Sequence, residues 1–185
     1  MNMAEIGASS YRRFLRLDAN SLDQILIAYS DALVRFAYSI VQDAATAEDI
    51  AAESMAILLT RQRYYKDEAH LRAYLYKVAR NKAIDYLRQR KNVVPLEDVE
   101  QVLGSGDPEL ALLETERNGA IYRCMQHLPE QYRQVLQLAY FDGIGIREIS
   151  RITRTNQKQI YNRLARAKAR MKSLLEKEGI THEDF

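Results

Sequence analysis

Residues 142–172, DGIGIREISRITRTNQKQIYNRLARAKARMK, decide the fold and are typical of a short helix, a tight turn and a longer helix. In the longer helix, apolar residues recur at intervals of three and four and give one continuous apolar stripe. The stripe consists of Ile160, Leu164, Ala167, Met171 and Leu174. The shorter helix packs through Ile146, Ile149 and Ile152. This pattern predicts a helix-turn-helix whose second helix enters a major groove of DNA.

The other positions of the longer helix are polar or cationic. Amides near its start suit the edges of bases, and the cations after them suit phosphates. These residues are Gln157, Lys158, Tyr161, Asn162, Arg163, Arg166, Lys168, Arg170 and Lys172, with Asn156 as the expected N-cap. The alternative is a basic surface helix that binds nothing. Arg154 departs from the usual pattern of a helix-turn-helix, because glycine usually supplies the left-handed residue of such a turn.

The composition of the 185 residues predicts an all-α protein, because helix formers dominate and glycine and proline are scarce. The single cysteine, Cys124, cannot form an internal disulfide, and we find neither a secretory signal nor a long apolar run. We therefore expect a soluble, cytoplasmic protein that is not inserted in a membrane. The three histidines lack ligand spacing, and no phosphate-binding loop is present. We expect no metal, no cofactor, no small-molecule substrate and no enzymatic activity.

The chain divides into two helical domains around an acidic segment that contains Pro95, Gly104 and Gly106. We predict an N-terminal extension (1–20), a first domain (21–91), a flexible acidic linker (92–107), a second domain with the helix-turn-helix (108–178) and a tail (179–185). Thr46 is expected to begin a helix, and another helix is expected to start around Pro129 and to run through Tyr140 towards Asp142. The negative linker can shield the two basic segments when DNA is absent.

Residues 70–91, HLRAYLYKVARNKAIDYLRQRK, interleave cations with aromatic side chains on one predicted helix. Proteins that bind single-stranded DNA combine a positive groove with aromatic platforms for the bases. The alternative is that these tyrosines lie at the edge of the core, which is the commoner role of tyrosine at helical spacing. Asn81 and Asp85 suit contacts with base edges, or a hydrogen bond along the helix surface.

Residues 71–88, LRAYLYKVARNKAIDYLR, closely resemble region 2.3–2.4 of the extracytoplasmic-function (ECF) sigma factors. Residues 128–136 and 146–168 resemble region 4 of the same family. The resemblance implies a factor that binds core RNA polymerase, through the β′ clamp helices and the β flap, and directs promoter recognition and melting. It also implies promoter DNA as a partner and an anti-sigma factor as a further one.

The resemblance implies three sets of site residues. The set for the minus-ten element is Arg72, Tyr76, Lys77, Arg80, Asn81, Asp85 and Arg88. The set for the minus-thirty-five element is Asn156, Gln157, Lys158, Gln159, Tyr161, Asn162, Arg163 and Arg166. The set for polymerase binding is Glu48, Asp49, Ala52 and Glu53, where the family commonly has glutamine in place of Ala52 and phenylalanine in place of Met55.

Two other functions remain open at this point. A helix-turn-helix regulator that acts without polymerase would bind two half-sites as a dimer and give a tight footprint on its own. A helical adaptor would use only the first domain to bind a protein partner. Co-elution with core polymerase separates the sigma factor from the adaptor.

Overall fold

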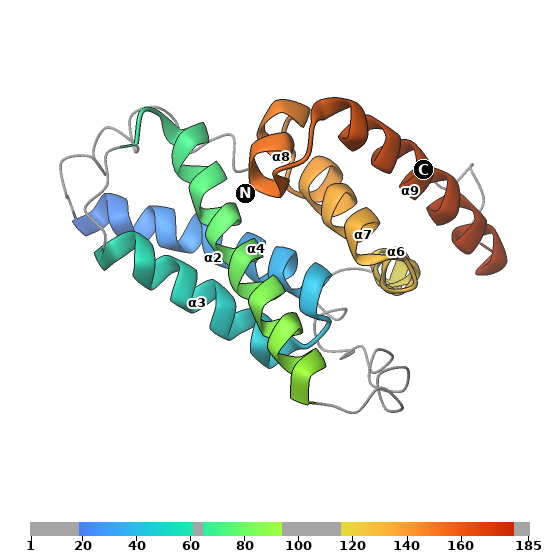
Figure 1. Ribbon diagram of the computed structural model, residues 1–185, viewed down its shortest axis with the longest axis horizontal. Helices are drawn as coiled ribbons and strands as arrows, with labels where there is room; N and C mark the ends of the chain where they lie inside the picture. Colours follow the sequence, from blue (N-terminus) through green and yellow to red (C-terminus); the bar gives the residue numbers. More distant parts are fainter. Residues whose placement is uncertain (1–18, 61–64, 94–115, 180–185) are drawn as a thin grey trace.

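A computed structural model describes residues 19–60, 65–93 and 116–179, and every element within these ranges is helical. The first group of helices comprises α2 (Ala19–Val41), α3 (Ala44–Thr60) and α4 (Glu68–Val93). The second comprises α6 (Glu116–Gln126), α7 (Glu130–Leu136), the π-helix η4 (Gln137–Phe141), α8 (Ile146–Thr153) and α9 (Gln157–Lys177). Figure 1 shows the two groups side by side, with α8 (orange) next to α4 (green). The predicted all-α fold with two helical domains is confirmed.

The predicted linker begins inside α4, which continues to Val93, and the rest of it lies outside the described residues. The predicted extension (1–20) lies outside them except for its last two residues, where α2 has already begun. Residues 180–185 of the tail are also outside the description. Among the helices that are described, none combines the length and the hydropathy required to cross a lipid bilayer.

The start of α3 differs from the prediction by a few residues. Thr46 was expected to cap this helix, but the backbone N–H of Thr46 donates to Asp43 Oδ1 at 2.8 Å, so Asp43 is the cap. The side chain of Thr46 first, and then this backbone N–H, lower the pKa of Asp43 by hydrogen bonding to its charged form. Gln42 precedes it with a left-handed backbone (φ 56°), which ends α2 and turns the chain into α3. An aspartate at this position satisfies a free N–H group of the first turn, as Thr46 would have done three residues later.

The helix predicted from Pro129 through Tyr140 changes its geometry part of the way along. α7 does not continue as a regular helix: the N–H of Asp142 bonds to the carbonyl of Gln137 at 3.0 Å, five residues back. This wider turn shifts the register of the following residues, so Leu138 is buried while Tyr140 is 54 % exposed. The ammonium of Lys168 in α9 lies 4.8 Å from the centre of the Tyr140 ring.

The helix-turn-helix is confirmed in α8 and α9. Ile149, Ile152, Ile160, Leu164 and Ala167 are buried, which is the predicted packing side. Asn156 caps α9 through its side-chain oxygen, which accepts from the N–H of Gln159 at 2.8 Å. Arg154 takes the left-handed conformation (φ 53°) that glycine usually supplies, at a cost of about 1 kcal/mol. The turn therefore keeps its usual path and carries some backbone strain.

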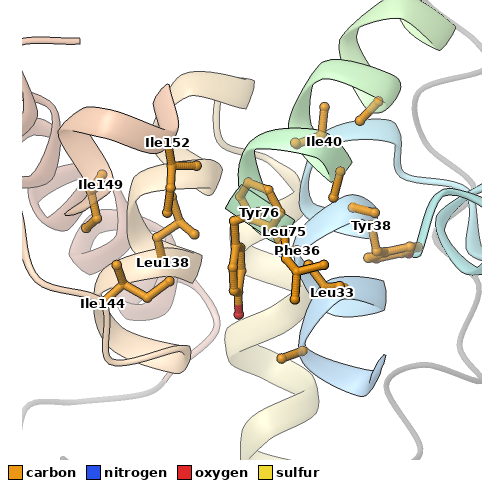
Figure 2. Close-up of a cluster of buried hydrophobic side chains, with 14 of the residues drawn as sticks. Leu33, Phe36, Tyr38, Ile40, Leu75, Tyr76, Leu138, Ile144, Ile149 and Ile152 are labelled. Atoms are coloured by element: carbon orange, nitrogen blue, oxygen red, sulfur yellow. The ribbon is translucent and has the colours of Figure 1, made fainter. Parts of the chain in front are cut away.

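The two groups of helices share one buried apolar cluster. Figure 2 shows Tyr76 of α4 between side chains of the two groups. On the side of the second group lie Leu138, Ile144, Ile149 and Ile152, and on the side of the first lie Leu33, Phe36 and Leu75. Tyr76 has no exposed surface, and its ring centre is 5.0 Å from that of Phe36. The contact between the domains is thus a continuation of their cores.

Candidate nucleic-acid interface

α9 presents the predicted minus-thirty-five residues on the side opposite its apolar stripe. Seven of the eight are exposed, and Arg163 is half-buried because its guanidinium donates to the hydroxyl of Thr155 at 3.3 Å. Tyr161 is 60 % exposed, although a large aromatic ring on a helix surface is usually covered. Asn156 already uses its side-chain oxygen as a cap, so only its amide nitrogen is available to a base. This face of α9 stays exposed while the two groups of helices are packed against each other.

α4 is divided into a covered half and an open half. The predicted minus-ten residues of its first turns, Arg72 and Tyr76, face the second domain, and Lys77, Arg80 and Asn81 are half-buried. Asp85 and Arg88 near its end are exposed, and their side chains are 3.5 Å apart. The sequence places all seven on one helix, but the structure exposes only part of the set.

Arg72 forms a two-pronged ion pair with Glu148 of α8. Its Nε donates to Oε1 at 2.8 Å and its Nη2 to Oε2 at 2.7 Å. The side chain of Arg72 is 19 % exposed and that of Glu148 13 %. The hydrogen bond to Glu148 is the main reason why the pKa of Arg72 is raised, against an opposing effect of burial. Such parallel N–H···O bonds are among the strongest that an arginine makes.

Arg80, two turns further along α4, also meets the second domain. Its Nε donates to the amide oxygen of Gln134 in α7 at 3.1 Å. The amide nitrogen of Gln134 in turn donates to Glu130, which fixes the orientation of the amide. Burial lowers the pKa of Arg80 although the group stays charged, and the nearby carboxylate of Glu130 acts in the opposite direction.

Tyr76 and Asp142 place polar atoms in the apolar contact between the domains. The hydroxyl of Tyr76 and Oδ2 of Asp142 are both buried, and neither has a partner with regular hydrogen-bond geometry among the described residues. They are nevertheless close enough to affect each other: burial first, and then the Asp142 charge, raise the pKa of Tyr76. Asp142 Oδ1 accepts from Gln137 at 3.2 Å. Burial raises the pKa of Asp142 to about 7, against the opposing effects of Gln137, Arg35, Tyr76 and Arg72.

A third contact between the domains lies at the end of α2. Arg133 of α7 is 8 % exposed, and its Nε donates to the carbonyl of Ser39 at 2.8 Å. Its Nη1 donates to the carbonyls of Leu128 and Gln126. Two more hydrogen bonds join the end of α6 to the end of α2: the side chain of Gln42 donates to the Gln126 carbonyl, and the side chain of Gln126 donates to the Tyr38 hydroxyl.

The predicted polymerase-binding residues Glu48, Asp49, Ala52 and Glu53 share one exposed face of α3. Glu53 also forms an ion pair with Lys82 of α4. Met55, where the family commonly has phenylalanine, is 7 % exposed and belongs to the core. The surface offered by α3 is therefore acidic and lacks a large apolar side chain at this position.

Sequence reasoning missed the residues through which the second domain covers α4. Glu148, Gln134 and Arg133 drew no attention, because their partners lie far away in the sequence. The pattern also missed a cleft of about 500 Å³ beside the interface, lined by Lys66, Asp67, His70, Arg147 and Arg151. Asp67, the one carboxylate among the described residues that line this cleft, accepts from the N–H of His70 as the cap of α4. Among the described residues no cluster of His, Cys, Asp and Glu is suited to a metal ion.

Comparison with known protein families supports two regions in the order seen here. Residues 26–93 match the family model described as Sigma-70 region 2, and residues 118–171 match Sigma-70, region 4. Together the two matches cover well over half of the chain.

Individual relatives match across both regions. The ECF RNA polymerase sigma factor SigM of Bacillus subtilis is 28 % identical over 166 residues, which cover 88 % of this chain and 99 % of the relative. The RNA polymerase sigma factor SigV of the same organism is 27 % identical over 147 residues, with 80 % and 86 % covered. Among solved structures, the sigma factor RpoE in complex with the anti-sigma factor NepR from Bartonella quintana has the same fold, with a TM-score of 0.66 at 21 % identity, covering 83 % of this chain and 96 % of that one.

Proposed function

The chain belongs to the extracytoplasmic-function family of RNA polymerase sigma factors, and from this premise we propose how its two domains divide the recognition of a promoter. It binds core RNA polymerase and promoter DNA and directs transcription initiation. We propose that α4 binds the minus-ten element as a separated strand and that α9 binds the minus-thirty-five element as a duplex. The chain itself makes and breaks no covalent bond, and it acts in the cytoplasm, where the polymerase works.

The observation that carries this division is the exposed face of α9. Its amides and cations point away from the buried stripe, as a helix in the major groove requires. On α4, Asn81, Asp85 and Arg88 offer hydrogen-bonding groups to a base that has left the stack. The acidic face of α3, with Glu48, Asp49, Ala52 and Glu53, is the surface that we assign to the β′ clamp helices, and the second domain is assigned to the β flap. An anti-sigma factor is a further proposed partner, since the RpoE structure above is such a complex.

Transcript starts mapped after induced expression identify candidate promoters, and transcription from them in vitro tests the function. We expect a promoter-dependent product only when the chain and core polymerase are both present. No product from any mapped promoter would contradict the proposal. A tight, specific footprint by the chain alone would instead favour a helix-turn-helix regulator that acts without polymerase.

Replacing Arg80 and Asn81 together by alanine should reduce the formation of open complexes about tenfold, with a smaller effect on initial binding. Contacts to an extruded base offset the cost of unstacking, and each is worth roughly 1–3 kcal/mol. Permanganate reactivity of the melted strand measures opening, and a gel-shift assay measures initial binding. Arg123→Ala, at an exposed arginine of α6, is the matched control and should change neither. Equal losses in both steps would contradict the role of α4.

A further inference from the structure

Asp142 is a titratable residue that the proposed function does not use, and it lies in the contact between the two domains. It follows η4 in the second domain and is close enough to Tyr76 of α4 to interact with it. Asp142 is 7 % exposed and Tyr76 has no exposed surface. Because the two side chains come from different domains, the packing of the domains takes the carboxyl of Asp142 out of water.

The polar atoms buried around Asp142 are short of one hydrogen-bond donor. Oδ2 of Asp142 and Oε1 of Gln137 are buried acceptors without a regular partner among the described residues, and the hydroxyl of Tyr76 also lacks one. This hydroxyl has a single hydrogen, so it can serve only one of the two acceptors. A buried polar atom without a partner destabilises the contact in which it lies.

A proton on Asp142 supplies the missing donor. The protonated carboxyl carries an O–H group, so Oδ2 donates a hydrogen bond and no longer requires one. Oδ1 keeps the hydrogen bond from the amide nitrogen of Gln137, at 3.2 Å. The hydroxyl of Tyr76 can accept from the new O–H group, and its own hydrogen then serves another acceptor. The neutral carboxyl also avoids the cost of burying a charge.

The groups around Asp142 do not cancel the effect of its burial. Burial is the largest influence and raises the pKa of Asp142 to about 7. The groups that act in the opposite direction come from η4, α2 and α4, and they are Gln137, Arg35, Tyr76 and Arg72. Arg72 also donates to both oxygens of Glu148 in α8, so its positive charge is shared between two carboxyl groups.

We propose that Asp142 is a proton-binding site between the domains, and that the bound proton holds the second domain docked against the first. In the ionised form the same contact carries a buried charge and an unpaired acceptor. Separation of the domains returns the carboxyl to water, where its pKa is about 4. The docked form therefore binds the proton more tightly, so separation becomes more favourable as the pH rises from about 4 to 7 and then levels off. This inference does not depend on which promoter element each domain binds.

Single-molecule energy transfer between two dyes on the full-length chain measures docking. The dyes are attached at two exposed positions, through Ala56→Cys in α3 and Ala169→Cys in α9, in a Cys124→Ala background. We expect the ratio of separated to docked chains to be about tenfold higher at pH 8 than at pH 5. Circular dichroism should give the same helix content at both pH values, because the domains separate without unfolding. An equal ratio at both pH values would overturn the proposal.

Asp142→Asn isolates the carboxyl. Asparagine supplies an N–H donor at every pH and does not ionise, so this variant should stay docked at pH 8 as at pH 5. Asp31→Asn, on the exposed side of α2, removes a carboxylate outside the contact and should keep the pH response of the unmodified chain. A response that persists in Asp142→Asn would come from another group, such as a histidine, and would overturn the proposal.

The carboxyl is also followed directly, without a substitution at Asp142. In a chain labelled with carbon-13 at the aspartate carboxyls, nuclear magnetic resonance should show one resonance that titrates at a pH of about 7. The proposal is wrong if no aspartate resonance titrates near neutral pH. The proposed function fails separately, if the chain supports no transcription from any mapped promoter with core polymerase.

Discussion

Arg133→Ala should lower the free energy of unfolding by about 3 kcal/mol, the largest effect that we expect from a single side chain. The guanidinium is buried and donates to the carbonyls of Ser39 in α2, of Gln126 at the end of α6 and of Leu128 just before α7. Alanine removes all these donors: the Gln126 carbonyl keeps its bond from Gln42, but the buried carbonyls of Ser39 and Leu128 lose the one from Arg133, each at a cost of about 1–3 kcal/mol unless water enters. The variant also leaves a cavity where the arginine stem was.

Urea denaturation followed by circular dichroism measures this loss. Arg123→Ala, at an exposed arginine of α6, should change the stability by no more than about 0.5 kcal/mol. Arg133→Lys retains the charge but not the planar fork, so it should recover only part of the lost stability. A loss below about 1 kcal/mol for Arg133→Ala would show that the three carbonyls do not depend on this side chain.

Asp142→Asn should stabilise the protein at pH 8 by about 2 kcal/mol and have little effect at pH 4. Burial raises the pKa of the Asp142 carboxyl from its ordinary value to about 7, so the folded chain binds a proton that the unfolded chain has released. The stability of the unmodified chain therefore falls as the pH rises from about 4 to 7, and stays lower above 7. The size of this pKa shift limits the stabilisation by Asp142→Asn at high pH to about 4 kcal/mol.

Asparagine is uncharged at every pH and can still accept from Gln137 at the position of Oδ1. The charged and titratable groups around this site are Arg72 and Tyr76 from α4 and Arg35 from α2. They stay in place in the variant, so the difference between the two chains isolates the carboxyl. Thermal or urea unfolding at several pH values measures it, with Asp31→Asn on the exposed side of α2 as the control. A difference that is the same at pH 4 and pH 8 would contradict the raised pKa.

Local patterns in the sequence predicted the local parts of the structure. The apolar stripe of α9 and the cap at Asn156 depend only on residues within one or two turns, and both are confirmed. The wide turn of η4, which shifts the register before Tyr140, was not predicted, because no residue type in that segment indicates such a turn. The turn between α8 and α9 has its usual left-handed residue, although this residue is Arg154 and not the glycine that the pattern leads one to expect.

The contact between the domains could not be predicted, because it joins residues that are distant in the chain. Arg72 and Glu148 are 76 positions apart, and each taken alone is an ordinary charged residue of a helix surface. Tyr76 was assigned to DNA on the family pattern, and its burial follows from the packing of α8 against α4. One signal was available: Glu148 is the single acidic residue between Asp142 and the end of the basic helix-turn-helix at residue 172.

The most direct test of the division between α4 and α9 is photocrosslinking in the complex of chain, core polymerase and a mapped promoter. A photoreactive phenylalanine analogue replaces either Arg88, an exposed residue of α4, or Lys158, an exposed residue of α9. We expect the α4 probe to label the non-template strand of the minus-ten element, and the α9 probe to label duplex DNA at the minus-thirty-five element. Labelling of both elements by one probe, or of neither by the α4 probe, would contradict the account.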